Sequence, residues 1–290
     1  MRIGVDVGGT KIAVGLVSDR GELLKKSTIP TLRGRSGEAL VADIASIIRD
    51  MTEETEYTII GLGVPGCIDC DSGLLVHANN IGDNIPFKEL LRYHFPNKII
   101  HVNNDATCAL IGEKLFGTAR DYKNLIMLTL GTGIGCGIIV NNEIYNVDGS
   151  GEVGHMTINF DGIKCSCGQN GCWEAYASAT GLSRIIKESE VNYNTRSIFE
   201  AAKAGEVPAI EILKIYINYL AIGICNLINV FAPDTIIIGG GLGNEGDFLF
   251  PRLREKLGGM VYKRPLTCDI VSANFGNNAG IIGAAFISEN

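Results

Sequence analysis

The feature that most restricts the fold of this 290-residue chain is an internal repeat of short strands joined by glycine turns. In the first copy, strands are expected at residues 2–7, 11–17 and 22–29, and in the second copy at residues 125–130, 134–140 and 143–147. Gly8-Gly9-Thr10 and Gly131-Thr132-Gly133 form the first turn of each copy. A repeated unit of three strands predicts two related lobes, each built on its own sheet.

Helices and strands alternate after each copy of the repeat. The periodicity predicts helices at residues 36–55, 106–116, 180–188, 198–204, 208–231, 248–257 and 278–287, and strands at residues 58–64, 99–102, 235–238 and 268–272. This order predicts an α/β fold of two duplicated lobes around a cleft, where small ligands usually bind. We expect a small lobe of residues 1–105, with a C-terminal helix at about 278–290 packing back on it, and a large lobe of residues 106–277.

Composition excludes several classes of protein. Asp and Glu number 32 against 25 Lys and Arg, a net charge of −7 without a basic run, which argues against a nucleic-acid partner. Nine cysteines are an odd number, and Asp6 interrupts any apolar leader, so we expect a reducing cytoplasmic environment. The uncharged stretch 215–233 is nearly long enough to span a membrane, but its asparagines and its amphipathic period predict a buried helix, with no membrane partner.

The first glycine turn lies in the motif Asp6-Val7-Gly8-Gly9-Thr10-Lys11. Adjacent glycines let backbone N–H groups approach an anion, while Thr10 adds a hydroxyl and Lys11 a cation. Asp6 could hold Mg²⁺ through water. Taken alone, the motif is equally compatible with a tight hairpin turn.

The second glycine turn, Gly131-Thr132-Gly133, has the same ambiguity. Together, one such hairpin per lobe could clamp a triphosphate from two sides. The motifs are not a Walker loop, because no Gly-x4-Gly-Lys-Ser/Thr sequence is present. Neither turn leads directly into a helix, so the dinucleotide-binding fingerprint is excluded as well.

Asn104-Asp105 joins an expected strand to an expected helix. One interpretation of Asp105 is an N-cap for that helix. The other is a general base, because a nearby carboxylate can accept the proton of a sugar hydroxyl during attack on phosphorus.

The most specific motif is His155, Cys165, Cys167 and Cys172, in and just ahead of a glycine-rich segment. One imidazole and three thiols supply a complete tetrahedral set for Zn²⁺, so the metal is expected to be structural. The alternatives are unrelated buried groups, or a redox pair without a thioredoxin-like context. Glu152 and Glu174 flank the site, and zinc could hold the loops that aim both carboxylates into the cleft. The free ring nitrogen of His155 could meet a hydroxyl.

Weaker signals complete the set of candidate residues. Gly239-Gly240-Gly241 ends an expected strand, and bare backbone there would accept a flat adenine ring. Gly66 and Asn80 could add polar contacts to a sugar, although Pro65-Gly66 is equally a turn. The other six cysteines show no ligand set, and His77, His94 and His101 show no evident partner.

The order and spacing of these motifs, from the first residue to the last, resembles the ROK family of repressors, open reading frames and sugar kinases. The resemblance implies an actin/hexokinase-like fold of two ribonuclease-H-like lobes and ATP-dependent transfer of phosphate to a hexose, usually at O6. It implies that Asp105 is the base and that Asn104, Glu152, His155 and Glu174 bind sugar. It also implies the zinc set above, and a phosphate clamp made of Asp6, Gly8, Gly9, Thr10, Lys11, Gly131, Thr132 and Gly133.

Substrate and assembly are less sharply predicted. Many family members carry a Trp soon after the Asn that follows the Pro-Gly strand, whereas residues 79–86 here contain no aromatic side chain. Glucose is the first expectation, and N-acetylmannosamine, allose, mannose and fructose are alternatives. A sugar-responsive repressor would need a helix-turn-helix domain before Asp6, and a catalytically inactive sugar binder is disfavoured by Asp105. Family members are often dimers or tetramers, so a homo-oligomer is expected.

Overall fold

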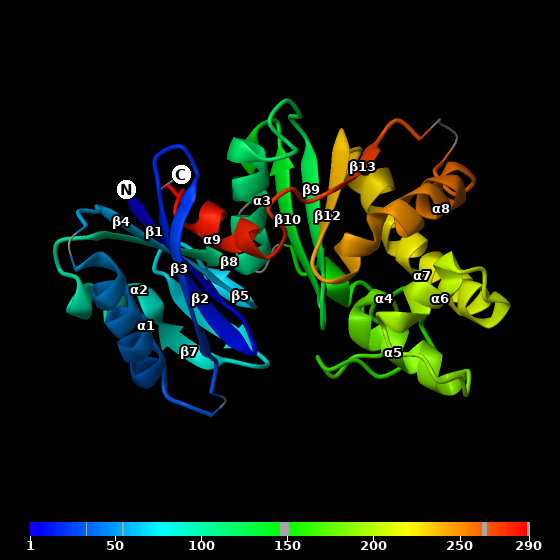
Figure 1. The fold of residues 1–290 in the computed structure, drawn as a ribbon, viewed down its shortest axis with the longest axis horizontal. Coiled ribbons are helices and arrows are strands. Elements are labelled where there is room, and N and C mark those ends of the chain that lie inside the picture. The colour runs from blue at the N-terminus through cyan, green and yellow to red at the C-terminus, as the bar shows by residue number, and fades with distance from the viewer. Residues whose placement is uncertain (33, 54, 146–150, 263–265, 289–290) are drawn as a thin grey trace. The chain divides into compact units, whose positions relative to one another are not determined.

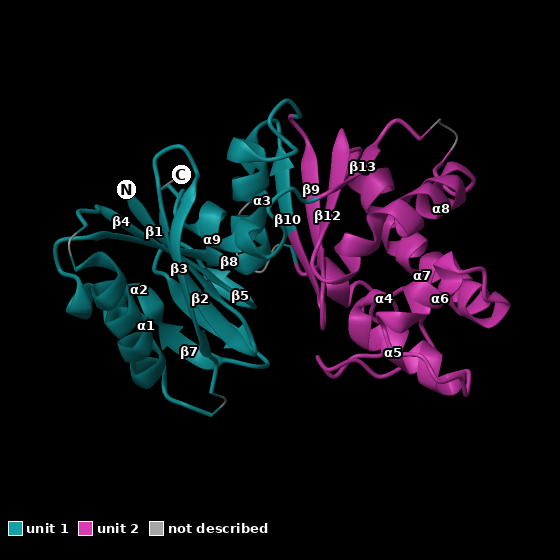
Figure 2. Cartoon of the chain, in the orientation of Figure 1, with its two compact units in different colours: residues 1–122, 137–151, 273–290 teal, residues 123–136, 152–272 magenta. Residues whose placement is uncertain are grey.

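The chain folds into two compact units, shown in Figure 2. The structure is a computed structural model that describes residues 1–32, 34–53, 55–145, 151–262 and 266–288. Unit 1 contains residues 1–122, 137–151 and 273–290, and unit 2 contains residues 123–136 and 152–272. Each unit is therefore assembled from segments that are distant in the sequence.

Unit 1 is built on a five-stranded sheet in the order β3-β2-β1-β4-β8. The strands are β1 (Arg2–Val7), β2 (Lys11–Val17), β3 (Leu23–Pro30), β4 (Ile59–Val64) and β8 (Ile99–Asn104). β1 pairs antiparallel with β2 and parallel with β4, and β8 continues the parallel part. The carboxyl ends of β1, β4 and β8 therefore lie at one edge of the sheet, the edge where open α/β sheets bind ligands.

Helices cover both faces of this sheet (Figure 1). The helices are α1 (Gly37–Thr52), α2 (Phe87–His94), α3 (Asp105–Phe116) and α9 (Ala279–Ala284). α1 and α2 share a buried apolar cluster with β1 and β4. On the other face, α9 lies directly on the backbone, since a Cβ added to Gly4 would be 1.9 Å from the Ile281 carbonyl oxygen. Glycine at position 4 is thus required by this close approach.

Unit 1 also contains a small antiparallel sheet of β5 (Cys67–Asp69), β6 (Leu74–Ala78) and β7 (Gly82–Pro86). This sheet and α2 are not among the predicted elements. The three strands are short, and their turns follow so closely that no hydrophobic period develops in the sequence.

The second repeat forms the sheet β11-β10-β9-β12-β13. Its strands are β9 (Leu125–Leu130), β10 (Ile134–Val140), β11 (Glu143–Ile144), β12 (Thr235–Gly239) and β13 (Asp269–Ser272). β10 passes from unit 2 into unit 1 at residue 137. The helices of unit 2 are α4 (Glu174–Ala177), α5 (Ala179–Glu188), α6 (Ser197–Lys203), α7 (Val207–Phe231) and α8 (Gly246–Gly258). Three 3₁₀ turns, Val153–His155, Leu242–Glu245 and Gly276–Asn278, complete the described elements.

α7 is the long helix predicted from the uncharged stretch. It is the one helix in the described part of the chain that is long and apolar enough to cross a membrane. Half of its most apolar 18-residue stretch is nevertheless buried inside the protein. Tyr216 is fully buried and donates its hydroxyl to the Ala177 carbonyl at 3.0 Å. α7 is therefore a core helix of unit 2.

Those observed elements that the sequence predicts differ from the prediction mainly at their ends. Both copies of the three-strand repeat are present, although residues 146–147 of the last predicted strand lie outside the described residues. α3 packs against α9 within unit 1. α9 packs on β1 and β4 of unit 1, and the two lobes with a boundary at residue 105 remain a prediction.

Candidate active site

The Gly8-Gly9-Thr10 turn connects β1 to β2 as a closed hairpin. The Gly8 N–H donates to the Lys11 carbonyl at 2.9 Å. Thr31 holds the turn from the side, since its hydroxyl donates to the Gly8 carbonyl at 2.6 Å and its N–H to the Thr10 carbonyl at 2.9 Å. The turn is therefore rigid before any anion binds, as a preformed anion site requires.

Asp6 lies beside this turn, near the end of β1. Protein surrounds most of its carboxyl group, and this burial raises the pKa of Asp6 to about 6, against a lowering effect of Lys11 and Lys26. α9 approaches so closely that a Cβ on Gly280 would be 3.1 Å from the Asp6 Cγ. A partly exposed, poorly solvated carboxylate is the kind of group that a hydrated Mg²⁺ ion would stabilise.

Asn104 and Asp105 divide two roles between them at the start of α3. Asn104 is the N-cap: its Oδ1 accepts from the N–H groups of Ala106 at 2.9 Å and Thr107 at 3.2 Å. Asp105 is the first residue of the helix, and its Oδ1 accepts from the Ala106 N–H at 2.8 Å. The N-cap interpretation of Asp105 is thus corrected: the cap is Asn104, whose extended backbone suits that position.

Gly66 and Asn80 join this group of residues within unit 1. The Asn104 Nδ2 donates to the Gly66 carbonyl at 3.2 Å, and Gly66 has a φ of +99° that favours glycine. A Cβ on Gly9 would be 3.2 Å from the Asn80 Cβ, which places Asn80 next to the first hairpin. His77, for which the sequence suggested no partner, is hydrogen-bonded to Asp83 at 2.7 Å and Asn79 at 3.1 Å.

The second glycine hairpin is anchored by the segment that begins α4 and α5. The Gly131 carbonyl accepts from the Ala179 N–H at 2.8 Å, and the Thr132 carbonyl from the Thr180 hydroxyl at 2.7 Å. The Ile134 N–H donates to Glu174 Oε2 at 2.9 Å. A Cβ on Gly133 would be 2.3 Å from that oxygen, so glycine is needed for Glu174 to approach the hairpin.

The four predicted metal ligands converge. The ligand atoms of His155, Cys165, Cys167 and Cys172 all lie within 4.8 Å of one another. The Cys167 and Cys172 sulfurs are 3.6 Å apart, and the Cys165 sulfur is 3.7 Å from His155 Nδ1. Two ligands on a tetrahedral Zn²⁺ at 2.3 Å would be about 3.8 Å apart. The set fits Zn²⁺ in both chemistry and spacing.

The thiols of this cluster are in unlike environments. The backbone hydrogen bond at Gln169 lowers the pKa of Cys167, whereas burial raises the pKa of Cys172 to about 12. A bound dication would deprotonate coordinating thiols regardless of these differences.

Residues next to the cluster connect it to the two flanking carboxylates. The Tyr176 hydroxyl accepts from the Ile163 N–H at 2.8 Å and from Asn159 Nδ2 at 3.3 Å, which holds the metal-site loop to α4. His155 Nε2, on the ring edge away from Cys165, lies 3.9 Å from Glu152 Oε2. The loop, Glu152 and Glu174 are therefore positioned together within unit 2.

Gly239 is the last residue of β12, and Gly240 and Gly241 follow it. Gly240 has a φ of +78°, and a Cβ there would be 2.5 Å from the Leu130 carbonyl oxygen. A Cβ on Gly241 would meet nothing within 4 Å. Gly240 thus has a structural reason to be glycine, while Gly241 borders open space.

The predicted residues form two sets, one in each unit. Unit 1 holds the first hairpin, Asp6, Gly66, Asn80, Asn104 and Asp105, and unit 2 holds the second hairpin, Glu152, Glu174, the metal cluster and the three glycines. The links that the sequence did not reveal are Thr31, Tyr176 and Thr180. Each contributes a side-chain hydroxyl, and Thr31 also its N–H, and such isolated contacts leave no motif in the sequence.

Comparisons with known proteins match nearly the whole chain. The family model described as "ROK family" matches residues 2–290. The glucokinase of Thermotoga maritima is 36% identical over 98% of this chain and 96% of its own length. The xylose repressor of Bacillus spizizenii is 31% identical over 98% of this chain and 76% of its own length.

A solved structure agrees in fold over the full length. The ROK family glucokinase from Streptomyces griseus, in complex with glucose and AMPPNP, has a TM-score of 0.87 and 30% identity, with 98% of both chains covered. This agreement confirms the predicted actin/hexokinase-like fold of two related α/β lobes. On the full-length match, the identity to its relatives and the shared fold, the chain belongs to the ROK family.

Proposed function

We propose that this protein is an ATP-dependent hexose kinase that transfers the γ-phosphate to the 6-hydroxyl of glucose. The observation that carries the proposal is the full-length agreement with a glucokinase whose structure contains glucose and AMPPNP, an ATP analogue. The placement of Asp105 supports it, because its carboxylate lies in the first turn of α3, just beyond the end of β8, and accepts a hydrogen bond from the Ala106 N–H at 2.8 Å.

The proposed chemistry gives the protein mainly positioning work. Asp105 orients the sugar hydroxyl and receives its proton late in the transfer. Asn104, Glu152, His155 and Glu174 hold the other hydroxyls, with Gly66 and Asn80 as additional polar contacts. Both glycine hairpins, together with Lys11, donate to the phosphates, and Gly241 borders the adenine. Asp6 would hold Mg²⁺, which neutralises phosphate charge when bound.

Zinc is proposed as a structural ion held by His155, Cys165, Cys167 and Cys172. A complete set of four protein ligands leaves no position for substrate. The ion would therefore act on the sugar only through the loop that carries it, by keeping His155 and Glu152 in place.

A panel of sugars tests the substrate. ADP formation is measured with glucose, mannose, fructose, allose and N-acetylmannosamine as acceptors. We expect the highest kcat/KM with glucose. A higher kcat/KM with another sugar would support kinase activity but assign a different substrate. If no sugar increases ADP formation, the protein is not a sugar kinase.

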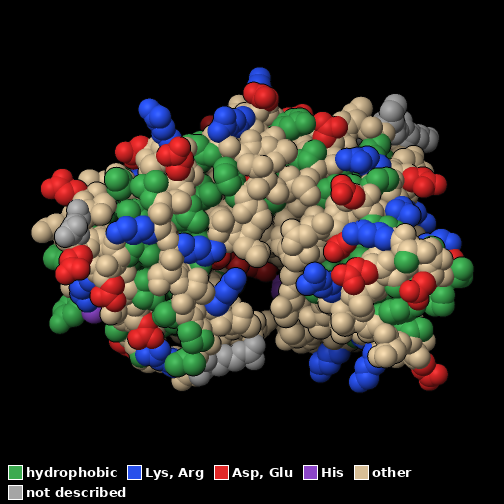
Figure 3. Space-filling view, viewed as in Figure 1, with side chains coloured by type: hydrophobic (Ala, Val, Ile, Leu, Met, Phe, Trp, Pro, Cys, Tyr) green, Lys and Arg blue, Asp and Glu red, His purple; other side chains and the backbone are tan. Residues whose placement is uncertain are grey.

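A repressor is the second candidate, because xylose repressors are among the relatives. The acidic chain opposes it: on the face seen in Figure 3, Lys and Arg side chains are interspersed with Asp and Glu rather than gathered in one patch. We expect no shift of random duplex DNA at low salt, where non-specific binding is strongest. We also propose a cytoplasmic location and a homo-oligomeric state.

A further inference from the structure

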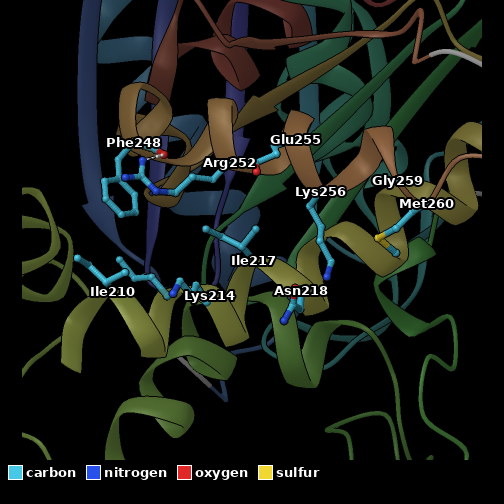
Figure 4. A pocket seen from close by; sticks show the side chains of 11 residues that line it. Ile210, Lys214, Ile217, Asn218, Phe248, Arg252, Glu255, Lys256, Gly259 and Met260 are labelled. Carbon is cyan, nitrogen blue, oxygen red and sulfur yellow. Dashed lines mark hydrogen bonds between the residues drawn. The ribbon is translucent and has the colours of Figure 1, made fainter. Parts of the chain in front are cut away.

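A groove lies between α7 and α8 of unit 2 (Figure 4). Its volume is about 540 Å³, and none of its described lining residues belongs to the candidate active site. Small molecules usually bind in pockets of about 300–1,000 Å³ that are mostly apolar and hold a few polar groups. The groove therefore has the size of a small-molecule site, and the chemistry of its walls indicates the class of ligand.

α7 supplies the apolar floor of the groove. Ile210, Leu213 and Ile217 are spaced by three and four positions, so they lie on one face of the helix. Buried Phe248 continues the apolar lining on the α8 side. Asn218 is the one neutral polar side chain among the described residues that line the groove. A ligand body on this floor must be apolar, because a polar body would lose its hydrogen bonds to water without finding new partners.

α8 supplies positive charge at the rim of the groove. Arg252 and Lys256 are exposed and four positions apart, and Figure 4 shows Lys256 extending from α8 toward α7. Lys214 of α7 adds a third cation, and Glu255 is the one acidic residue in the described lining. Three cations against one anion are opposite to the net charge of −7 of the whole chain. Charge complementarity therefore favours a ligand with an anionic head group.

The two cations of α8 are not neutralised by neighbouring side chains. Within the residues that the structure describes, neither Arg252 nor Lys256 forms an ion pair, although Glu255 is close to both in the sequence. Lys214 differs, since its Nζ lies 2.5 Å from Glu211 Oε1. Arg252 and Lys256 are therefore the groups that an anion at the rim would neutralise.

Phe248 fixes the guanidinium group of Arg252. The Arg252 Cζ lies 3.6 Å from the centroid of the Phe248 ring, and its Nη1 donates to the Phe248 carbonyl at 2.8 Å. A guanidinium group carries five N–H donors, and this bond uses one of them. The group is thus oriented before any ligand binds, and it retains donors for a bidentate contact with a carboxylate.

We propose that the groove binds a medium-chain fatty acid, with its aliphatic chain along the floor and its carboxylate between Arg252 and Lys256. The floor from Ile210 to Ile217 is about 10 Å long at 1.5 Å per residue, which suits a medium rather than a long chain. A nucleotide would satisfy the cations with its phosphates, but the polar edges of its base would find almost no partners on the floor. The site is separate from the proposed sugar and nucleotide sites, and it does not depend on kinase activity.

A series of fatty acids tests the apolar floor. The zinc-loaded protein is titrated with hexanoate, heptanoate and octanoate at pH 7, and binding is followed by nuclear magnetic resonance of the ligand. Each methylene group that becomes buried should lower the dissociation constant about fourfold. A dissociation constant that is the same for all three acids would overturn the proposal, because the chain would then remain in water.

A double variant, Arg252→Gln with Lys256→Gln, tests the head-group contact. Glutamine forms helices about as well as arginine and lysine, so α8 should be preserved. We expect octanoate to bind at least ~10-fold more weakly, because the charge-assisted hydrogen bonds are lost. The matched control, Lys187→Gln with Arg196→Gln, removes the same charge at exposed positions of unit 2 and should bind as the wild type does. Equal binding by the two double variants would overturn the proposal.

Lys256→Gln alone serves as a second variant in case the loss of the Arg252 contacts to Phe248 lowers the unfolding temperature. This single change removes no side-chain hydrogen bond or ion pair among the described residues, and it should weaken octanoate binding several-fold. Octanoate binding equal to that of the wild type would exclude Lys256 from the site and contradict the proposed position of the carboxylate.

Two further ligands separate a fatty acid from other apolar compounds. Octanol has the same chain without the charge and should bind at least ~10-fold more weakly than octanoate. Equal binding of octanol would show a merely apolar surface and overturn the proposal. Phospholipids combine an acidic group with aliphatic chains as well, so sedimentation with phosphatidylglycerol vesicles is measured, and we expect none. Sedimentation with the vesicles in the absence of octanoate binding would assign the groove to a membrane surface instead.

Discussion

At the scale of single residues, the start of α3 shows how two neighbouring side chains can divide tasks that the sequence suggests for one. The sequence offered capping or catalysis for Asp105, and it cannot reveal which of two adjacent residues leaves the helical conformation. The structure assigns the cap to Asn104, with two backbone N–H groups on its Oδ1. Helix capping therefore does not account for a carboxylate at position 105.

The first prediction concerns the base. Asp105→Asn keeps the shape and the hydrogen bond from Ala106 but removes the proton acceptor. We expect kcat for glucose phosphorylation to fall about 10²-fold or more, with glucose affinity and unfolding temperature unchanged. Steady-state ADP release measures kcat, and titration calorimetry with glucose measures the affinity. Asp121→Asn, at an exposed position, serves as the control, and near-normal turnover in Asp105→Asn would exclude the role.

The second prediction concerns pH and Asp6. Burial raises its pKa from 3.8 to about 6, so the neutral form is favoured in the folded state. The associated stability is fully present below the unfolded pKa of 3.8 and is lost as pH rises through 6. Asp6→Asn should therefore stabilise the ligand-free chain at pH 7 by up to about 3 kcal/mol, and have little effect near pH 4.

Chemical denaturation of both forms at the two pH values measures this difference. The same variant should lose activity, because a neutral amide does not hold hydrated Mg²⁺ as a carboxylate does. If Asp6→Asn lowers the free energy of unfolding equally at pH 4 and pH 7, the buried charge of Asp6 does not destabilise the folded chain.

At the scale of elements, the sequence predicted what is long and periodic. Both copies of the three-strand repeat, α1 with its Ser36 cap and the long α7 could be predicted from apolar periods and cap residues. The β5–β7 sheet, α2 and α4 could not, because strands of three to five residues and helices of eight and four residues are too short to show a clear period. Their formation depends on packing against segments distant in the sequence.

The third prediction concerns the second hairpin. Gly133→Ala places a Cβ 2.3 Å from Glu174 Oε2 and displaces the carboxylate from the Ile134 N–H. We expect a loss of about 1–3 kcal/mol in stability and a weaker affinity for glucose. Gly131→Ala is the matched control, because its Cβ would meet nothing within 4 Å. Equal unfolding temperatures for the two variants would show that the hairpin adapts without Glu174.

The fourth prediction concerns the metal-site loop. Cys172→Ser, or chelation of the wild type, should lower the unfolding temperature and the glucose affinity together, since the loop carries His155 and ends beside Glu174. Metal content by mass spectrometry should fall from one zinc per chain. Cys268→Ser, a buried cysteine outside the cluster, should retain the metal. A loss of activity with unchanged stability and affinity would contradict a structural zinc.

At the scale of the whole molecule, the two units are assembled from segments that are distant in the sequence. Unit 1 takes in residues 137–151 and 273–290, which follow the segments of unit 2 in the chain. α3 belongs to unit 1 because its glycine at 112 and Gly283 of α9 allow the two helices to approach closely. Such long-range contacts leave little trace in local periodicity, whereas the lobe boundary predicted at residue 105 rests on a local signal, the change from a strand to a helix.

The fifth prediction belongs to this scale because it concerns stability of the whole chain. Glucose should raise the unfolding temperature of the wild type and of Asp105→Asn alike, since binding does not require the base. At 100 times the dissociation constant, a ligand specific to the folded state adds about 2.7 kcal/mol. Differential scanning fluorimetry with glucose and with xylose measures the effect. If only xylose raises the unfolding temperature, a function like that of the xylose repressors is favoured over a glucose kinase.

The central claim is phosphoryl transfer from ATP to the 6-hydroxyl of glucose. Its most direct measurement is nuclear magnetic resonance of the product mixture after incubation of the zinc-loaded protein with ATP, Mg²⁺ and glucose. The account predicts a single sugar phosphate with the phosphorus coupled to the protons on carbon 6, formed in equal amount with ADP. ADP with inorganic phosphate and no sugar phosphate, or a phosphate on another carbon, would contradict it.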